Sequence, residues 1–182
     1  MLVISFTLAR EGAKTTVRNL VDERLSDVLI IKIIHEGRHI NMPGPDVEIC
    51  YGDRIIAMGT KERLENFLIL LRQSEGIDTP SRDPMTMRQY IYSEMHQKLE
   101  PEDQLMCCIV PIEWGGPFTG VSIKNSGFKE KYGGFIIGLE RNNLAVPDPH
   151  INSIMMEGDI IWTLGDKSMA DKLLQDGLLS EK

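Results

Sequence analysis

The sequence predicts an α+β fold made of two tandem copies of one small module, because one set of landmarks occurs twice in the same order. The landmarks of the first copy are Pro43, Pro45, Gly52, Asp53 and Gly59, and those of the second are Pro147, Pro149, Gly158, Asp159 and Gly165. The prolines repeat at an offset of 104 residues and the others at 106, which predicts a two-residue insertion between them. A repeat of this kind indicates a duplicated structural unit.

The length of 182 residues fits two such units. We expect the first copy at residues 1–73, a connector at 74–104 with a helix at 84–99, and the second copy at 105–182. Each copy has roughly 70–75 residues, which is near the lower limit for an adequate hydrophobic core. Units of this size usually gain stability by packing on each other or on a second chain, so pairing of some kind is expected.

The first copy contains several short runs of β-branched and aliphatic residues. These runs predict strands at 2–8, 28–34, 39–42 and 54–58. The polar stretch 13–25 is expected to hold one short helix. Leu64, Phe67 and Leu71 recur at helical spacing, which predicts an amphipathic helix over residues 61–72.

The second copy and the connector follow the same kind of pattern. Strands are expected at 105–110, 133–140, 144–146 and 160–164, with a closing helix at 167–175. In the connector, Asp83 is a suitable N-cap and Pro84 a suitable first helical residue. Two interpretations of this helix stay open: a connector packed on one or both modules, or a coupling helix that passes motion to a partner.

The composition excludes several classes of protein. An apolar share of 42% and a charged share of 26% are typical of a soluble globular chain. No apolar run approaches the ~20 residues that a membrane helix needs, and the first residues do not resemble a signal peptide. A net charge of −7 without a basic run argues against general nucleic-acid binding. Three cysteines, an odd number, favour buried reduced thiols in a cytosolic compartment.

No catalytic or metal-binding motif stands out from the sequence. The two Gly-Asp pairs are interpreted as turns that lead into strands. His35 and His39 flank a turn between strands rather than sharing a helix face, so we expect no metal site there. Glycine-rich phosphate loops and nucleophile motifs are also missing from the sequence. We therefore expect no enzyme activity.

Two segments carry a resemblance to a known family. Residues 128–149 contain the turn Lys131-Tyr132-Gly133, a short hairpin and a Pro-x-Pro step, and residues 157–165 contain Gly-Asp, a strand and a final glycine. This order resembles the C-terminal subdomain of regulator-of-potassium-conductance proteins, also called the TrkA C-terminal or RCK_C domain. Residues 105–175 match throughout, whereas residues 2–71 match less well because Ser26-Asp27 replaces the Lys-Tyr-Gly turn.

The resemblance implies a βαβββα-type module with a mainly antiparallel sheet, helices on one side, and pairing of the two copies about a pseudo-two-fold axis. It implies a regulatory, ligand-sensing domain of a monovalent cation (potassium or sodium/proton) transporter or channel. The partners would be the membrane-embedded core and a second copy in a homodimer, at the cytoplasmic side of the plasma membrane. The alternative is a structural dimerisation module without a small-molecule ligand.

Ligands of such modules bind at the pairing interface, and cyclic di-AMP or another nucleotide is the effector that the resemblance suggests. We predict a ligand site in the second copy, where the glycines allow close approach, the lysine neutralises an anion and the apolar residues contact a ring. Its residues are Lys131, Tyr132, Gly133, Gly134, Phe135 and Ile136. The equivalent stretch of the first copy is Val28, Leu29 and Ile30. The alternative interpretation of both stretches is a plain turn and a core strand.

Overall fold

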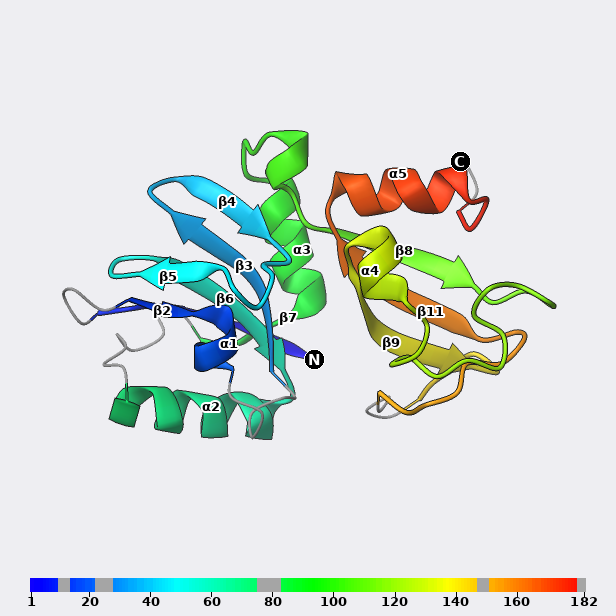
Figure 1. Cartoon of the computed structure of the whole chain (residues 1–182), viewed down its shortest axis with the longest axis horizontal. Coiled ribbons are helices and arrows are strands. Elements are labelled where there is room, and N and C mark those ends of the chain that lie inside the picture. Colours follow the sequence, from blue (N-terminus) through cyan, green and yellow to red (C-terminus); the bar gives the residue numbers. More distant parts are fainter. Residues whose placement is uncertain (10–13, 22–27, 75–82, 147–150, 180–182) are drawn as a thin grey trace. The chain divides into compact units, whose positions relative to one another are not determined.

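The computed structural model describes residues 1–9, 14–21, 28–74, 83–146 and 151–179. The chain separates into two compact units, Met1–Lys98 and Leu99–Lys182, which are described in turn below (Figure 1). Pro147, Pro149 and the Ser26-Asp27 step of the expected repeat lie outside the described residues. None of the described helices is both long and apolar enough to span a membrane.

Unit 1 is built on a five-stranded antiparallel sheet with the order β4-β3-β6-β1-β7. Its strands are β1 (Leu2–Thr7), β3 (Leu29–His35), β4 (Arg38–Asn41), β6 (Arg54–Gly59) and β7 (Met85–Thr86). A two-stranded ribbon of β2 (Lys14–Thr16) and β5 (Glu48–Cys50) and the short helix α1 (Val17–Leu20) complete the crossover.

The main core of unit 1 lies between the sheet and helix α2 (Lys61–Ser74). Leu64, Phe67 and Leu71 are buried, as their spacing predicts. The ring of Phe67 packs edge-on against that of Phe6 from β1, with centroids 5.8 Å apart.

Helix α3 (Met87–Met95) packs through Tyr90 and Glu94 on the other face of this sheet, where Lys32 of β3 is buried. The connector helix therefore belongs to the first compact unit. The predicted helix start at Asp83 and Pro84 is wrong. Thr86 is the N-cap, because its side-chain oxygen accepts from the Gln89 backbone N–H. In return, the Gln89 side-chain oxygen accepts from the Thr86 backbone N–H, which completes a capping box.

Unit 2 follows the expected βαβββα order after a short 3-10 helix, η2 (Pro101–Asp103). Its elements are β8 (Met106–Pro111), α4 (Phe128–Tyr132), β9 (Phe135–Arg141), β10 (Leu144–Ala145), β11 (Ile160–Gly165) and α5 (Lys167–Gln175). The antiparallel sheet has the order β10-β9-β11-β8. The core lies on one face of this sheet, where α4 and α5 contribute Phe128, Tyr132, Met169 and Leu173.

The register of the strands shows that the two units are copies of one module. The β3–β6 ladder has a bulge at Ile31, and the β9–β11 ladder has one at Ile137, 106 residues later. The backbone bonds of the crossover recur as well: Val17 N–H donates to Val47 O, and Ile123 N–H donates to Ser153 O. An α+β architecture with two antiparallel sheets is thus confirmed.

The position predicted for the two-residue insertion is wrong. Equivalent residues of the first strands, β1 and β8, are 104 positions apart in the sequence, as their pairing with β6 and β11 shows. Val17 and Ile123, which make equivalent backbone bonds, are already 106 positions apart. The length difference therefore falls between the first strand and the crossover. Arg18 N–H donates to Pro45 O and Lys124 N–H to Ile151 O, so the counterpart of Pro45 is Ile151 rather than Pro149.

Candidate functional site: a groove in unit 2 and two pinned turns

Unit 2 contains a groove of about 590 Å³. The end of β8, the loop that follows it and the turn after α5 form its walls. Its apolar lining consists of Ile109, Pro111, Ile112, Pro117, Phe118, Leu178 and Leu179. Glu113 and Asp176 supply the ionisable groups of the lining. The groove thus offers apolar surface with charge at a few points, as small-molecule sites generally do.

Lys131, a predicted site residue, is connected to this groove through Asp176. Its ammonium nitrogen lies 2.6 Å from a carboxylate oxygen of Asp176, which also accepts a hydrogen bond of 2.8 Å from the Tyr132 hydroxyl. The lysine hydrogen bond holds the pKa of Asp176 below its usual value, and Asp176 raises the pKa of Lys131. Both side chains are solvent-accessible, so an incoming anion can compete with Asp176 for the lysine.

The ring of Phe135 contacts a cationic side chain, that of Lys129, which the sequence did not indicate. The ammonium group of Lys129 lies 4.7 Å from the centroid of the half-buried Phe135 ring. Lys129 and Lys131 are on α4, a five-residue helix where the sequence predicted only a turn. At the expected Lys131-Tyr132-Gly133 turn, the first two residues end helix α4, and Gly133 is its C-cap residue in a left-handed conformation, with φ of 80°.

The remaining predicted residues of the second copy have structural surroundings. Tyr132 is 1% exposed and packs on Phe128 and Phe118 in the core. A Cβ on Gly134 would collide with the sulfur of Met169, so this glycine lets α5 approach the strand. Ile136 packs against the same core.

Val28, Leu29 and Ile30 belong to unit 1. Val28 and Ile30 are 2% and 4% exposed within its core, and Leu29 is half-buried. Their role as a second ligand-binding stretch stays a prediction, as does the role of the six residues in unit 2.

The Gly-Asp turn of unit 2 is fixed by a buried carboxylate. Asp159 Oδ1 and Oδ2 accept from Arg141 Nε and Nη2 at 2.8 and 2.7 Å, and Oδ2 also accepts from the Met156 backbone N–H at 2.7 Å. These donors, Arg141 foremost, lower the pKa of Asp159. The pair joins the end of β9 to the start of β11, so the aspartate stabilises the turn.

Unit 1 repeats this arrangement with different side chains. Asp53 Oδ2 accepts from the Cys50 backbone N–H at 2.8 Å, and Asp53 Oδ1 lies 2.6 Å from His35 Nδ1. The hydrogen bond with Asp53 raises the pKa of His35. A histidine therefore occupies the position that an arginine holds in unit 2.

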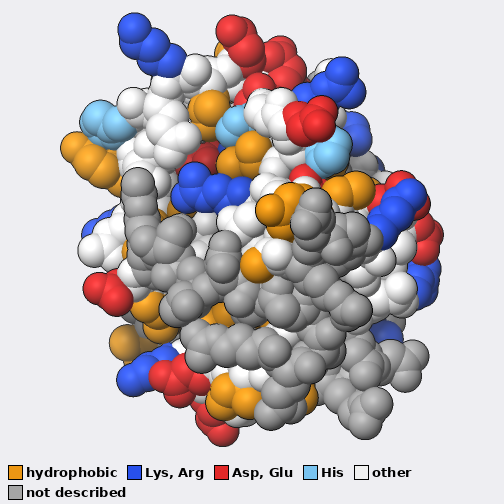
Figure 2. Space-filling model, turned by 90° about the vertical axis from the view of Figure 1, so that its left-hand side faces the viewer, with side chains coloured by type: hydrophobic (Ala, Val, Ile, Leu, Met, Phe, Trp, Pro, Cys, Tyr) orange, Lys and Arg blue, Asp and Glu red, His pale blue; other side chains and the backbone are white. Residues whose placement is uncertain are grey.

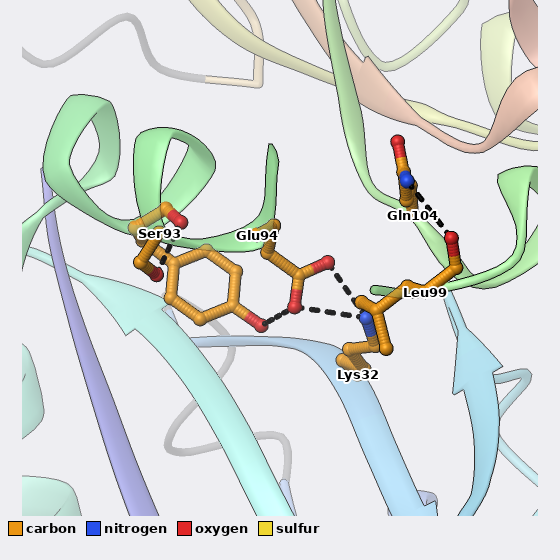
Figure 3. A network of polar contacts seen from close by, with 6 residues as sticks. Lys32, Ser93, Glu94, Leu99 and Gln104 are labelled. Carbon is orange, nitrogen blue, oxygen red and sulfur yellow. Dashed lines mark hydrogen bonds and ion pairs between the residues drawn. The ribbon is translucent and has the colours of Figure 1, made fainter. Parts of the chain in front are cut away.

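A buried polar network joins α3 to the sheet of unit 1 (Figure 3). Lys32 Nζ donates to both carboxylate oxygens of Glu94, at 2.9 and 2.7 Å, and the Tyr90 hydroxyl donates to the same carboxylate at 2.9 Å. The side chains of Lys32 and Glu94 are 0% and 4% exposed. Because two buried charges face each other, removal of either one takes the charged partner in this pair from the other.

The cysteines and the charge on the described part of one face bear on nucleophilic chemistry and on nucleic-acid binding. All three cysteines are free and half-buried rather than buried, and burial raises the pKa of the Cys107 thiol to about 11, so it is protonated at neutral pH. On the described part of the face in Figure 2, basic and acidic side chains are interspersed and form no continuous basic surface.

No protein-family model matches the chain, and no curated protein matches it either. The solved structures that the chain matches include domains of RCK type. One is the RCK_C domain dimer of S. agalactiae BusR in complex with c-di-AMP, with 19% identity over 38% of this chain and 91% of that one, at a TM-score of 0.34. Such domains are thus among the solved structures that the chain resembles, as its sequence predicts.

Three further matches cover a larger share of the chain. The RCK domain of GsuK is matched over 95% of this chain and 62% of that chain, with 11% identity and a TM-score of 0.34. The GsuK channel is matched over 42% of this chain and only 13% of that chain, with 27% identity and a TM-score of 0.35. S. agalactiae BusR in complex with its busAB-promotor DNA matches 68% of this chain and 66% of its own, with 15% identity and a TM-score of 0.35.

Proposed function

We propose that this chain is a non-enzymatic, ligand-sensing regulatory domain of a monovalent cation transporter or channel, and that unit 2 receives the ligand. The observation that carries the proposal is the position of Lys131, which is held by an accessible carboxylate at the wall of an apolar groove. The sequence resemblance to RCK_C domains and the duplicated module support the same function.

An anionic ligand with an aromatic base fits this chemistry. Its phosphate would replace Asp176 as the partner of Lys131, while the base would contact apolar side chains such as Phe135 or the groove lining. Cyclic di-AMP, or another adenine nucleotide, has both groups. Binding would regulate a membrane-embedded partner only if the ligand prefers one arrangement of paired modules over another. The chain would then act as a homodimer at the cytoplasmic side of the membrane.

Calorimetric titration of the full chain with cyclic di-AMP, AMP and ATP tests this proposal. Lys131→Ala should weaken binding about tenfold or more, because a charge-assisted hydrogen bond contributes about 1.5–3 kcal/mol. Phe135→Ala should weaken it as well. The matched control is Lys167→Ala, which removes a lysine from another exposed Lys-Asp pair of the same unit. Unchanged binding in both site variants would show that the site is elsewhere.

A structural dimerisation module is the second candidate, and the exposed apolar side chains of unit 2 favour it. Ile109, Trp114 and Leu144 are 49%, 82% and 71% exposed. Large exposed apolar side chains mark an interaction surface where they form a contiguous patch. Sedimentation at several protein concentrations separates the candidates: strong self-association with no nucleotide bound would support the structural role and contradict ligand sensing.

A further inference from the structure

Three side chains with metal-binding atoms converge in unit 1. They are His35 at the end of β3, Cys50 at the end of β5 and Asp53 in the turn before β6. One ligand atom from each, an imidazole nitrogen, the thiol sulfur and a carboxylate oxygen, lies within 4.8 Å of the other two. From the sequence, only His39 was considered as a partner for His35, and no metal site was expected there; His39 is not part of this cluster.

The backbone holds two of these three residues firmly. The Cys50 N–H donates to Asp53 Oδ2, the Asp53 N–H donates to Cys50 O, and Leu8 N–H donates to Asp53 O. The carboxylate of Asp53 is 3% exposed, whereas the side chain of His35 is 40% exposed. The cluster is thus anchored on its inner side and open to solvent on the side of the histidine.

The distances are close to those of a tetrahedral site. Zinc bonds to nitrogen, sulfur and oxygen are about 2.0–2.3 Å long, so ligand atoms around one ion lie roughly 3.3–3.8 Å apart. To bind one ion, His35 Nδ1 and Asp53 Oδ1, now 2.6 Å apart, would have to separate by about 1 Å. Any pair of the three ligand atoms that is as far apart as the 4.8 Å limit would have to approach by about 1 Å. Rotation of the half-exposed His35 ring and of the Cys50 side chain supplies movements of this size.

Unit 2 provides an internal comparison. The residues 106 positions after His35, Cys50 and Asp53 are Arg141, Met156 and Asp159. The backbone frame is the same, because the Met156 N–H donates to Asp159 Oδ2 as the Cys50 N–H does to Asp53. Arginine has no lone pair for a metal, and a thioether is a soft, weak ligand for zinc. The frame thus carries a structural ion pair in unit 2 and three metal-binding side chains in unit 1.

We propose that His35, Cys50 and Asp53 bind a divalent transition metal ion of the zinc type, with a fourth position open to water. A neutral imidazole, a thiolate and a carboxylate suit Zn²⁺, and the two anionic ligands balance its charge. Binding would release the thiol proton of Cys50 to solvent. The proposal is independent of the nucleotide site in unit 2.

Titration of the metal-free full chain with Co²⁺, under reducing conditions, tests the proposal. A thiolate-bound cobalt ion gives sulfur-to-metal charge-transfer absorption, and we expect one equivalent to produce it. Zn²⁺ should then displace the cobalt and remove the absorption. Absence of the thiolate band in the wild-type protein would overturn the proposal.

The double variant H35R/C50M gives unit 1 the side chains of unit 2, so it should keep the fold and lose more than about 100-fold in Zn²⁺ affinity. His96→Ala and Cys107→Ala are controls that should keep the band. If H35R/C50M fails to fold, alkylation of wild-type Cys50 decides: Zn²⁺ should protect this thiol but not Cys107. Equal alkylation of Cys50 with and without Zn²⁺ would contradict the site.

Discussion

At the scale of single residues, two buried aspartates stabilise the repeated turn. Asp53 and Asp159 are each 2% exposed, and each accepts a backbone N–H from the residue three positions earlier. The sequence indicated the turn through the Gly-Asp pairs but not the basic partner. His35 and Arg141 precede these aspartates by 18 positions, and only the pairing of strands brings them close.

Asp159→Asn should destabilise unit 2 by about 1–3 kcal/mol, because it removes a charge that accepts from Arg141 and Met156. Since the folded-state pKa of Asp159 is lowered, its contribution is fully present above the unfolded pKa of about 3.9 and is lost as the pH falls through the lower folded value. Urea unfolding followed by tryptophan fluorescence, to which Trp114 and Trp162 of unit 2 contribute, should therefore show a difference between wild type and variant that shrinks below about pH 4. A difference that does not change with pH would contradict this role.

The adjacent Gly133 and Gly134 are required for different reasons: Gly133 for its positive φ, and Gly134 for the close approach of neighbouring atoms. Gly134→Ala should cost about 1–3 kcal/mol, because the new Cβ would clash with Met169 and with the Leu164 carbonyl oxygen. Gly133→Ala meets no atom within 4 Å and should cost about 1 kcal/mol for its positive φ alone. Thermal unfolding of both variants tests the order, and equal losses would show that the packing at Gly134 is not tight.

At the scale of elements, α3 is fixed to the sheet by the pair of Lys32 and Glu94. Glu94→Gln should destabilise unit 1 by about 3–5 kcal/mol, because it leaves a buried ammonium group without its counter-charge. The double variant K32M/E94L should lose much less, since neither charge remains. Tyr90→Phe, which removes one hydrogen bond, should cost about 1 kcal/mol. Urea unfolding followed by circular dichroism measures all three, and a small loss in Glu94→Gln would contradict the assigned role.

The same pair bears on the two interpretations of the connector helix. A coupling helix would have to move, and movement of α3 away from the sheet would break a buried ion pair. This favours a helix that moves together with the sheet of unit 1. The sequence predicted the helix from its apolar spacing but placed its start three residues early, because Asp83-Pro84 and Thr86-x-x-Gln89 both resemble helix starts.

The elements with strong local signals were predicted well, and those that depend on tertiary contacts were not. The closing helix Lys167–Gln175 was predicted with its observed bounds, because Asp166 caps it and its apolar residues recur regularly. The resemblance implied a first helix in unit 2, but the residues of α4 were not predicted, because five residues carry too little periodicity. The sequence indicated Lys131 but not its partner Asp176, because the two residues are 45 positions apart and only the fold brings them together. The contact of Lys129 with the Phe135 ring was missed because it depends on helix α4.

At the scale of the whole molecule, the two copies of the module have diverged in what their shared frame carries. Unit 1 places a histidine and a cysteine beside its turn aspartate and has α3 on its second sheet face. Unit 2 has an arginine and a methionine at those positions, and a groove beside Lys131 and Asp176. We infer that the copies have different tasks, a nucleotide site in unit 2 and a metal site in unit 1.

Hydrogen exchange of the full chain, measured by mass spectrometry with and without cyclic di-AMP, tests the central claim most directly. The account predicts slower exchange in residues 128–141 and 176–179 when the ligand is present, because these segments carry Lys131, Phe135 and the wall of the groove. Identical exchange in both samples, at a ligand concentration that saturates other cyclic di-AMP receptors, would contradict ligand sensing by unit 2.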